Sequence, residues 1–233
     1  MRWWSRRRAR KVRLVLLWFA TWKNTGNSYA PEWVKRDTVR FPRMRKADGT
    51  AHYALSPHGP NTLEADKRAF VALMRHLAKI DRDHVVIMVQ PENEAGSYGL
   101  ARDHAPAADR LFHGPVPTEL AKALKVKPGS WTETFGKRAE QYFQTWHLAR
   151  YIDEIAEAGK AVKPLPMYVN AALGDAFTDE GGNVGPSGGP NLERDPVWKA
   201  AAPHIDLLAP DIYTPIPSRC RAFWRNTRGP TML

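Results

Sequence analysis

Four short apolar runs divide the chain, and their spacing constrains the fold more than any other feature. Each run is nearly continuous in hydrophobic residues and lacks the strict alternation of a strand with one solvated face, which is typical of strands buried on both faces. Segments long enough for a helix separate the runs. We therefore predict buried strands at Val12–Phe19, His84–Val89, Leu165–Val169 and Ile205–Ala209.

Helical periodicity occupies the intervals between these runs. Helices are predicted at Asn61–Asp81, where Asn61 and Glu64 have the spacing of a capping box, at Lys137–Ala161, where Gly159 ends the pattern, and at Val197–Ala202. Strands alternating with helices indicate an α/β fold with a parallel sheet. The apolar positions of the two long helices are Phe70, Leu73, Met74, Leu77 and Ile80, then Phe143, Trp146, Ile152 and Ile155.

Two long polar segments, 95–117 and 174–195, interrupt this pattern. The second is too rich in Gly and Pro for regular structure. Both follow the carboxyl ends of predicted strands, where long loops in a compact domain commonly bind ligands. No internal repeat and no linker between two domains is visible in the sequence.

The charge distribution argues against a nucleic-acid-binding protein. Residues 1–46 hold 14 Lys and Arg against 2 Asp and Glu, whereas residues 47–215 hold 17 against 22. The body of the chain is therefore mildly acidic, while a nucleic-acid binder carries its basic face across the fold. The single cysteine, Cys220, excludes a disulfide framework and a site of several thiolates.

The start of the chain has two interpretations. Its basic residues followed by an apolar run at 14–20 have the arrangement of a signal peptide, but the run is short and no small-residue cleavage pattern follows it. A buried strand explains the same letters, and we favour the strand. No segment reaches the ~18 apolar residues that a membrane-spanning helix needs, so no membrane partner is expected.

Polar and aromatic side chains gather where the predicted strands end. Because the ligand site of parallel α/β proteins lies beyond the carboxyl ends of the strands, these residues can be considered as one set. Carboxylates and amides bind sugar hydroxyls, aromatic faces pack on sugar rings, and a carboxylic acid can protonate a leaving oxygen. The set comprises Trp18, Trp22, Lys23 and Asn24, then Gln90, Glu92, Asn93 and Glu94, then Asn170, and finally Asp211 and Tyr213.

Several of these residues have alternative roles that the sequence leaves open. Glu92 is expected to turn away from Glu94 and to serve as a supporting hydrogen-bond partner. Trp18 and Trp22 are candidates for the core as well as for stacking, and Asp211 for holding a neighbouring loop. A divalent metal on Glu92, Glu94 and Asp211 is a further alternative, although the preferred interpretation has no metal and no cofactor.

A family resemblance adds to this interpretation. The segments "VLLWFATWKN", "YAPEWVKRD", "VQPENEAGSYG", "PLPMYVNAAL" and "AAPHIDLLAPDIY" resemble bacterial β-galactosidases of glycoside hydrolase family 35, which is related to family 42 within clan A. The resemblance covers residues 12–215 and implies a (β/α)8 (TIM) barrel. It implies that Glu94 is the general acid/base and that Asn93 bonds the sugar 2-hydroxyl. It also implies that Trp22, Asn170 and Tyr213 line a galactose subsite, and that the partner is a β-galactoside.

The chain departs from that family in ways that predict a fragment. The four strands correspond to strands three to six of eight, and no Asp or Glu follows Asp211 to act as the nucleophile of a retaining enzyme. The basic ends, 1–11 and 216–233, do not resemble the family. An open half-barrel leaves sheet edges and an apolar face uncovered, so either poor solubility or association, of which a homo-oligomer is one form, is expected.

Two other functions remain open from the sequence. One is a different clan A activity, such as a β-glucosidase or an endo-acting hydrolase. The other is a non-catalytic carbohydrate-binding remnant. Localisation is not predicted, although relatives are often exported.

Overall fold

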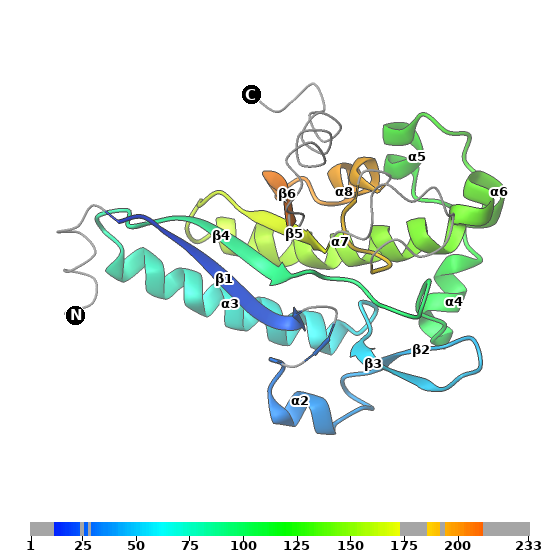
Figure 1. The fold of residues 1–233 in the computed structure, drawn as a ribbon, viewed down its shortest axis with the longest axis horizontal. Helices are drawn as coiled ribbons and strands as arrows, with labels where there is room; N and C mark the ends of the chain where they lie inside the picture. Colours follow the sequence, from blue (N-terminus) through cyan, green and yellow to red (C-terminus); the bar gives the residue numbers. More distant parts are fainter. Residues whose placement is uncertain (1–11, 24–25, 28, 173–185, 192–193, 212–233) are drawn as a thin grey trace, which may run out of the picture.

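Four parallel strands form the centre of the molecule (Figure 1). The computed structural model describes residues 12–23, 26–27, 29–172, 186–191 and 194–211. Strand β1 pairs in parallel with β4, and β5 pairs in parallel with β6. A parallel bridge between Val89 and Met167 joins the two pairs, so the order across the sheet is β1-β4-β5-β6. The strands are β1 (Leu14–Lys23), β4 (Val86–Asn93), β5 (Tyr168–Ala172) and β6 (Leu207–Asp211).

The predicted strands are confirmed, but their boundaries are wrong. Each strand begins two or three residues later than predicted and continues into the polar residues that follow the apolar run. Backbone pairing, rather than hydrophobicity, sets these ends, since Lys23 still pairs with Asn93 at the far end of β1 and β4. Several polar residues of the predicted site therefore lie in the last residues of the strands rather than in the loops that follow. They are Lys23, Gln90, Glu92, Asn93, Asn170 and Asp211, and Glu94 comes directly after β4.

One face of β1 is uncovered by the described residues. The side chains of Val15 and Leu17 are 44% and 51% exposed, and Ile87 at the start of β4 is 44% exposed. Neighbouring Leu14 and Leu16 pack against the core instead. The prediction that this strand is buried on both faces is wrong, because only the face toward the helices is covered within the described chain.

Two long helices cover the other face of the sheet: α3 (Pro60–Ile80) and α7 (Ala139–Lys160) (Figure 1). Phe70, Met74 and Leu77 of α3 are buried as predicted, whereas Ile80 is exposed at the helix end. The predicted capping box is wrong, because α3 begins after Gly59 and the Asn61 amide donates to the Arg40 carbonyl instead.

Gly159 has a packing role rather than the predicted role of ending the second helix. It lies inside α7, which continues to Lys160. A Cβ at this position would collide with the ring of Phe70 on α3. The missing side chain therefore lets the two helices approach closely, and Gly is required for that contact.

Shorter elements fill the connections between the strands. An antiparallel hairpin of β2 and β3 follows α2, and three short helices lie in the long connection between β4 and α7. The prediction of a loop at 95–117 is therefore partly wrong, because this segment contains α4. Most of the second predicted loop, at 173–185 and 192–193, lies outside the described residues. The elements are α2 (Glu32–Arg36), β2 (Arg43–Arg45), β3 (Ala51–Leu55), α4 (Pro106–Phe112), α5 (Thr118–Leu124), α6 (Trp131–Phe135), η1 (Gly136–Arg138) and α8 (Asp195–Ala201).

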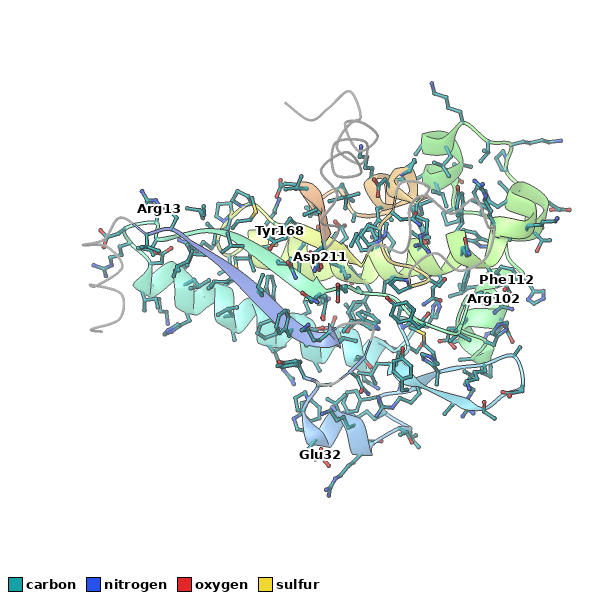
Figure 2. The ribbon with its side chains drawn as sticks, viewed as in Figure 1. Arg13, Glu32, Arg102, Phe112, Tyr168 and Asp211 are labelled. Carbon is teal, nitrogen blue, oxygen red and sulfur yellow. The ribbon has the colours of Figure 1, made fainter. Side chains whose placement is uncertain are left out.

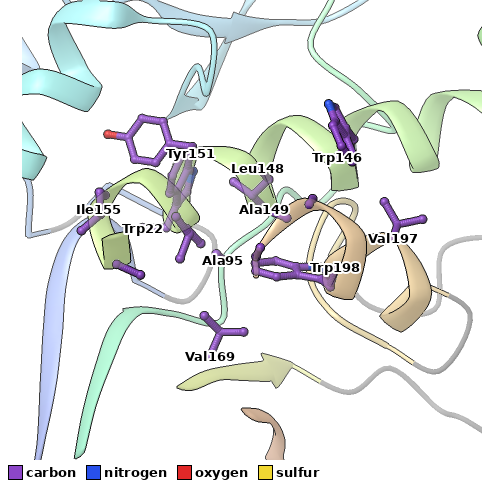
Figure 3. Packing of buried hydrophobic residues seen from close by; sticks show 14 of the residues in the cluster. Trp22, Ala95, Trp146, Leu148, Ala149, Tyr151, Ile155, Val169, Val197 and Trp198 are labelled. Atoms are coloured by element: carbon purple, nitrogen blue, oxygen red, sulfur yellow. The ribbon is translucent and has the colours of Figure 1, made fainter. Parts of the chain in front are cut away.

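A cluster of buried aromatic and aliphatic side chains supports the strand ends from below (Figure 3). Trp22 at the end of β1 packs edge to face against Tyr151 of α7, with ring centroids 4.8 Å apart. Trp198 of α8 is fully buried, and its Nε1 donates to the Gly188 carbonyl at 3.1 Å. This packing fixes the end of the sheet where the candidate site lies. Within the described chain, no helix has the length and apolar character needed to cross a membrane.

Candidate functional site

The side chain of Asn170 links the polar ends of three strands. Its Oδ1 accepts a hydrogen bond from the Glu94 backbone N–H at 2.8 Å. Its Nδ2 donates to Asp211 Oδ2 at 2.6 Å and to Asn93 Oδ1 at 3.2 Å. Gln90 Nε2 also donates to Asn93 Oδ1, at 3.1 Å. The structure therefore brings together Asn93, Glu94, Asn170 and Asp211, which the sequence predicted to share one site, and Figure 2 labels Asp211 near the centre of the molecule.

The backbone around the candidate acid adopts an uncommon conformation. Glu92 and Glu94 have φ angles of 62° and 45°, in the left-handed region that residues with a side chain rarely occupy. Such conformations cost of the order of 1–3 kcal/mol each and concentrate at functional sites. In a regular strand these two residues would project from the same face. They take different partners here because the backbone turns at both residues.

Glu92 is buried and bonds to the backbone of β1. Its Oε1 accepts from the Thr21 N–H at 3.1 Å, and its Oε2 accepts from the Trp22 and Ala20 N–H groups at 2.7 and 3.3 Å. These bonds replace strand pairing at the place where the register of β1 and β4 shifts. Glu92 thus holds the end of β1 in place.

Asp66 of α3 lies beside Glu92 and forms a buried carboxyl pair with it. Asp66 Oδ1 accepts from Trp18 Nε1 at 2.9 Å, and Oδ2 accepts from Thr21 Oγ1 at 2.6 Å. Burial raises the pKa of Glu92 well above its usual value, and the charge of Asp66 and a hydrogen bond with it raise the pKa further. Sequence reasoning missed Asp66, because a single Asp on a helix carries no signal of its buried position.

Glu94 points to different partners and stays half-buried. Burial raises its pKa, and a hydrogen bond and like-charge repulsion from Asp211 raise the pKa further, whereas Lys23 acts in the opposite direction. A raised pKa extends the protonated form to higher pH, and the protonated form is the one that a general acid needs.

Exposed tyrosines lie near Glu94. Tyr98 follows β4 and Tyr53 belongs to β3, and both are about half exposed. The Tyr98 hydroxyl interacts electrostatically with Glu94 and with Tyr53, which together with burial raises its pKa. Exposed aromatic faces beside a carboxyl group suit the apolar side of a sugar ring. The sequence signal for Tyr98 was its place in the segment "VQPENEAGSYG"; the hairpin that carries Tyr53 was not predicted.

The remaining predicted residues lie elsewhere. Trp22 has no exposed surface, and its Nε1 has no hydrogen-bond partner among the described residues, so its ring packs the core and is not presented to a ligand in this structure. Trp18 is likewise packed, against Phe70. Asn24 and Tyr213 lie outside the described residues.

The alternative metal site receives no geometric support. Among the described residues, no group of three or more His, Cys, Asp or Glu side chains is arranged to hold a metal ion. Both oxygens of Glu92 accept backbone N–H groups of β1, whereas Asp211 bonds to Asn170. Glu92, Glu94 and Asp211 therefore do not converge on one point.

Parallel strands covered by helices, with polar groups gathered at the carboxyl ends of the strands, are the arrangement of a (β/α)8 barrel. Solved structures agree with this arrangement. The chain is similar to a β-galactosidase from Bacillus circulans sp. alkalophilus (TM-score 0.52, 15% identity, 85% of this chain and 31% of that one). It is also similar to a β-galactosidase from the psychrophilic Marinomonas ef1 (TM-score 0.55, 11% identity, 88% and 31%). The catalytic domain of a β-amylase from Paenibacillus polymyxa matches with a TM-score of 0.53 and 12% identity, over 89% of this chain and 63% of that one.

These similarities show the fold and its extent. The chain is a partial TIM barrel of the glycosidase type, as predicted, and it spans about a third of the length of the β-galactosidases it resembles. A further neighbour is a GH42 β-galactosidase from G. stearothermophilus (TM-score 0.50, 14% identity, 86% and 30%). The predicted assignment to family 35 in particular is not supported by these similarities. No family model and no curated protein matches the sequence.

Proposed function

We propose that this chain carries the acid half of a β-galactosidase-type active site, with Glu94 as general acid/base. The observation that carries the proposal is the strained end of β4, which holds Glu94 half-exposed beside Asp211 with a raised pKa. A strained backbone and a shifted carboxyl pKa at one strand end are typical of catalytic sites. Asn93, placed one residue before, is the proposed ligand of the sugar 2-hydroxyl.

The proposed substrate is a terminal β-galactoside. The support is the resemblance of five sequence segments to β-galactosidases, together with structural neighbours that bear the same name. The exposed rings of Tyr53 and Tyr98 are the proposed stacking surface. Trp22 is not proposed as a contact, because its ring is buried.

The second carboxylate of a retaining glycosidase is not positioned among the described residues. A nucleophile must lie about 5–5.5 Å from the acid, with the anomeric carbon reached by both. Asp211 already interacts with Glu94 and accepts from Asn170, and the oxygens of Glu92 accept from the backbone of β1. This observation favours a second candidate function, carbohydrate binding without hydrolysis.

Hydrolysis and binding can be separated in one experiment. The chain, Glu94→Gln and the control Glu157→Gln, which changes an exposed carboxylate of α7, are assayed on a chromogenic β-galactoside. Galactose binding is measured in parallel by saturation-transfer NMR. Hydrolysis that Glu94→Gln abolishes and the control keeps supports the enzyme. Binding without hydrolysis, weakened by Asn93→Ala, supports the second candidate, and the absence of both contradicts the two.

A further inference from the structure

The end of β6 carries a carboxyl group that the proposed mechanism leaves without a role. Asp211 is within hydrogen-bonding reach of Glu94, although the two residues come from strands that are not neighbours in the sheet. Two carboxylates at that separation repel one another strongly unless one of them holds a proton.

Asn170 holds this pair together from the strand between them. Its amide oxygen accepts from the Glu94 N–H, and its amide nitrogen donates to Asp211 Oδ2 at 2.6 Å. The other Nδ2 bond goes to Asn93, which Gln90 also bonds, so the orientation of the amide is fixed on both sides. Asn170 is thereby fully engaged within the protein, which differs from the sugar-binding role that the family resemblance implied.

We propose that Asp211 is a positioning residue for Glu94: held by Asn170, its carboxylate accepts a hydrogen bond from the protonated Glu94 and keeps that proton in place until a substrate takes it. Among the residues that the structure describes, two other titratable groups face Glu94. Lys23 from β1 favours the ionised form, and Tyr98 from the loop after β4 stays neutral. The effect of Asp211 on the pKa of Glu94 thus opposes the effect of Lys23.

The consequence for the reaction rests on the proposed function. One proton passes from Glu94 to the glycosidic oxygen as the bond from that oxygen to the anomeric carbon breaks, with the electron pair remaining on the oxygen. The carboxyl pair then changes from one negative charge to two. The repulsion in the doubly charged state favours the return of a proton to Glu94, which a general acid/base requires in the second step.

The test is a direct titration that does not depend on hydrolysis. The full chain is labelled with ¹³C at the side-chain carboxyl carbons of Glu and Asp, and the Glu94 signal is assigned from its loss in Glu94→Gln. In Asp211→Asn, the midpoint of the Glu94 titration is expected to fall by roughly one pH unit or more. In Asp206→Asn, which changes the carboxylate just before β6 that pairs with Lys160, the midpoint is expected to stay unchanged. An unchanged Glu94 midpoint in Asp211→Asn overturns the proposal.

A second measurement uses the unaltered chain, so the proposal remains testable if Asp211→Asn does not fold. Carboxyl groups that share a proton titrate together in two steps. A Glu94 signal that titrates in two steps supports the pair, and a single step overturns it. Hydrolysis without a shared titration contradicts the pairing alone, whereas a shared titration without hydrolysis contradicts the proposed enzyme alone.

Discussion

Two carboxyl pairs lie near the end of β4, and they differ in how deeply they are buried. The inner pair, Glu92 and Asp66, is buried and surrounded by neutral donors. The outer pair, Glu94 and Asp211, is partly exposed, and Asn170 bonds to both residues. The same functional group thus holds the sheet together in one place and remains available to solvent in the other.

The difference in burial and hydrogen bonding predicts that the inner pair mainly affects stability and the outer pair mainly affects titration. Every donor around the inner pair would be left buried and unsatisfied if the pair were removed, and each such group costs about 1–3 kcal/mol. Removing the outer pair exposes its partners to water, which replaces the lost bonds. Large losses of stability are therefore expected from the inner pair and changes in titration from the outer one.

The largest expected effect is on the stability of Glu92→Ala. This substitution leaves the N–H groups of Ala20, Thr21 and Trp22 without their acceptor, so the free energy of unfolding is expected to fall by roughly 3 kcal/mol or more. Glu94→Ala is the matched variant and is expected to change stability by less than about 1 kcal/mol. Urea unfolding of both proteins measures the difference, and equal losses would remove the distinction between the two pairs.

Two buried histidines should make the stability of the fold depend on pH in the opposite direction from the inner carboxyl pair. His58 and His147 have ring centroids 4.6 Å apart, and burial lowers the pKa of His58 to about 4 and that of His147 to about 3. Because the unfolded chain binds protons on both rings first, stability is expected to fall as pH drops below about 6.5. His147→Phe, compared with the exposed control His113→Gln, should reduce this loss in thermal unfolding between pH 7 and pH 4.

The inner pair should weaken the fold at alkaline pH. Because the pKa of Glu92 is raised, the folded protein keeps the Glu92 proton to a higher pH than the unfolded chain does. The stability that this proton contributes is present below the ordinary Glu pKa and is lost as pH rises through the folded-state pKa. Asp66→Asn removes one charge, and the Thr21 hydroxyl can turn to accept from the new amide. We expect a flatter dependence of stability on pH between 5 and 9 than in the unaltered chain. An unchanged slope would mean that the two carboxyls do not interact.

The smallest of these effects concerns a single donor of the inner pair. Thr21 Oγ1 donates to Asp66 at 2.6 Å and lies 2.9 Å from the Tyr151 hydroxyl. Thr21→Val keeps the shape and removes the hydroxyl, so a loss of about 1–2 kcal/mol is expected. Thr118→Val, at an exposed position of α5, is the control. A loss no greater than in the control would mean that Thr21 adds nothing to the stability of the inner pair.

The fold was predictable from the sequence to the extent that it depends on hydrophobic pattern. The four strands, their parallel arrangement and the two long helices follow from apolar runs and helical spacing. Strand ends were not predictable, because pairing of β1 and β4 resumes at Lys23 and Asn93 beyond the register shift, and no hydrophobic pattern marks these residues. The role of Gly159 also depends on the ring of Phe70, nearly ninety positions away, which no local signal contains.

The candidate site was predictable as a set of residues but not as a geometry. Glu94, Asn93, Asn170 and Asp211 were grouped from their places after strands, and the structure brings them together. The choice between core and stacking for Trp22 stayed open and the inner partner Asp66 was missed, since both depend on how α3 and α7 pack on the sheet.

The face of β1 that the described residues leave uncovered makes the stability of the folded chain depend on contact with another surface. Burying a side chain such as Val15, Leu17 or Ile87 contributes on the order of 1.5–3 kcal/mol relative to full exposure, and each is still about half exposed. That free energy is released only when another surface covers the strand. The melting temperature of the chain is therefore expected to rise with its own concentration, as it does for a protein whose folding is coupled to assembly.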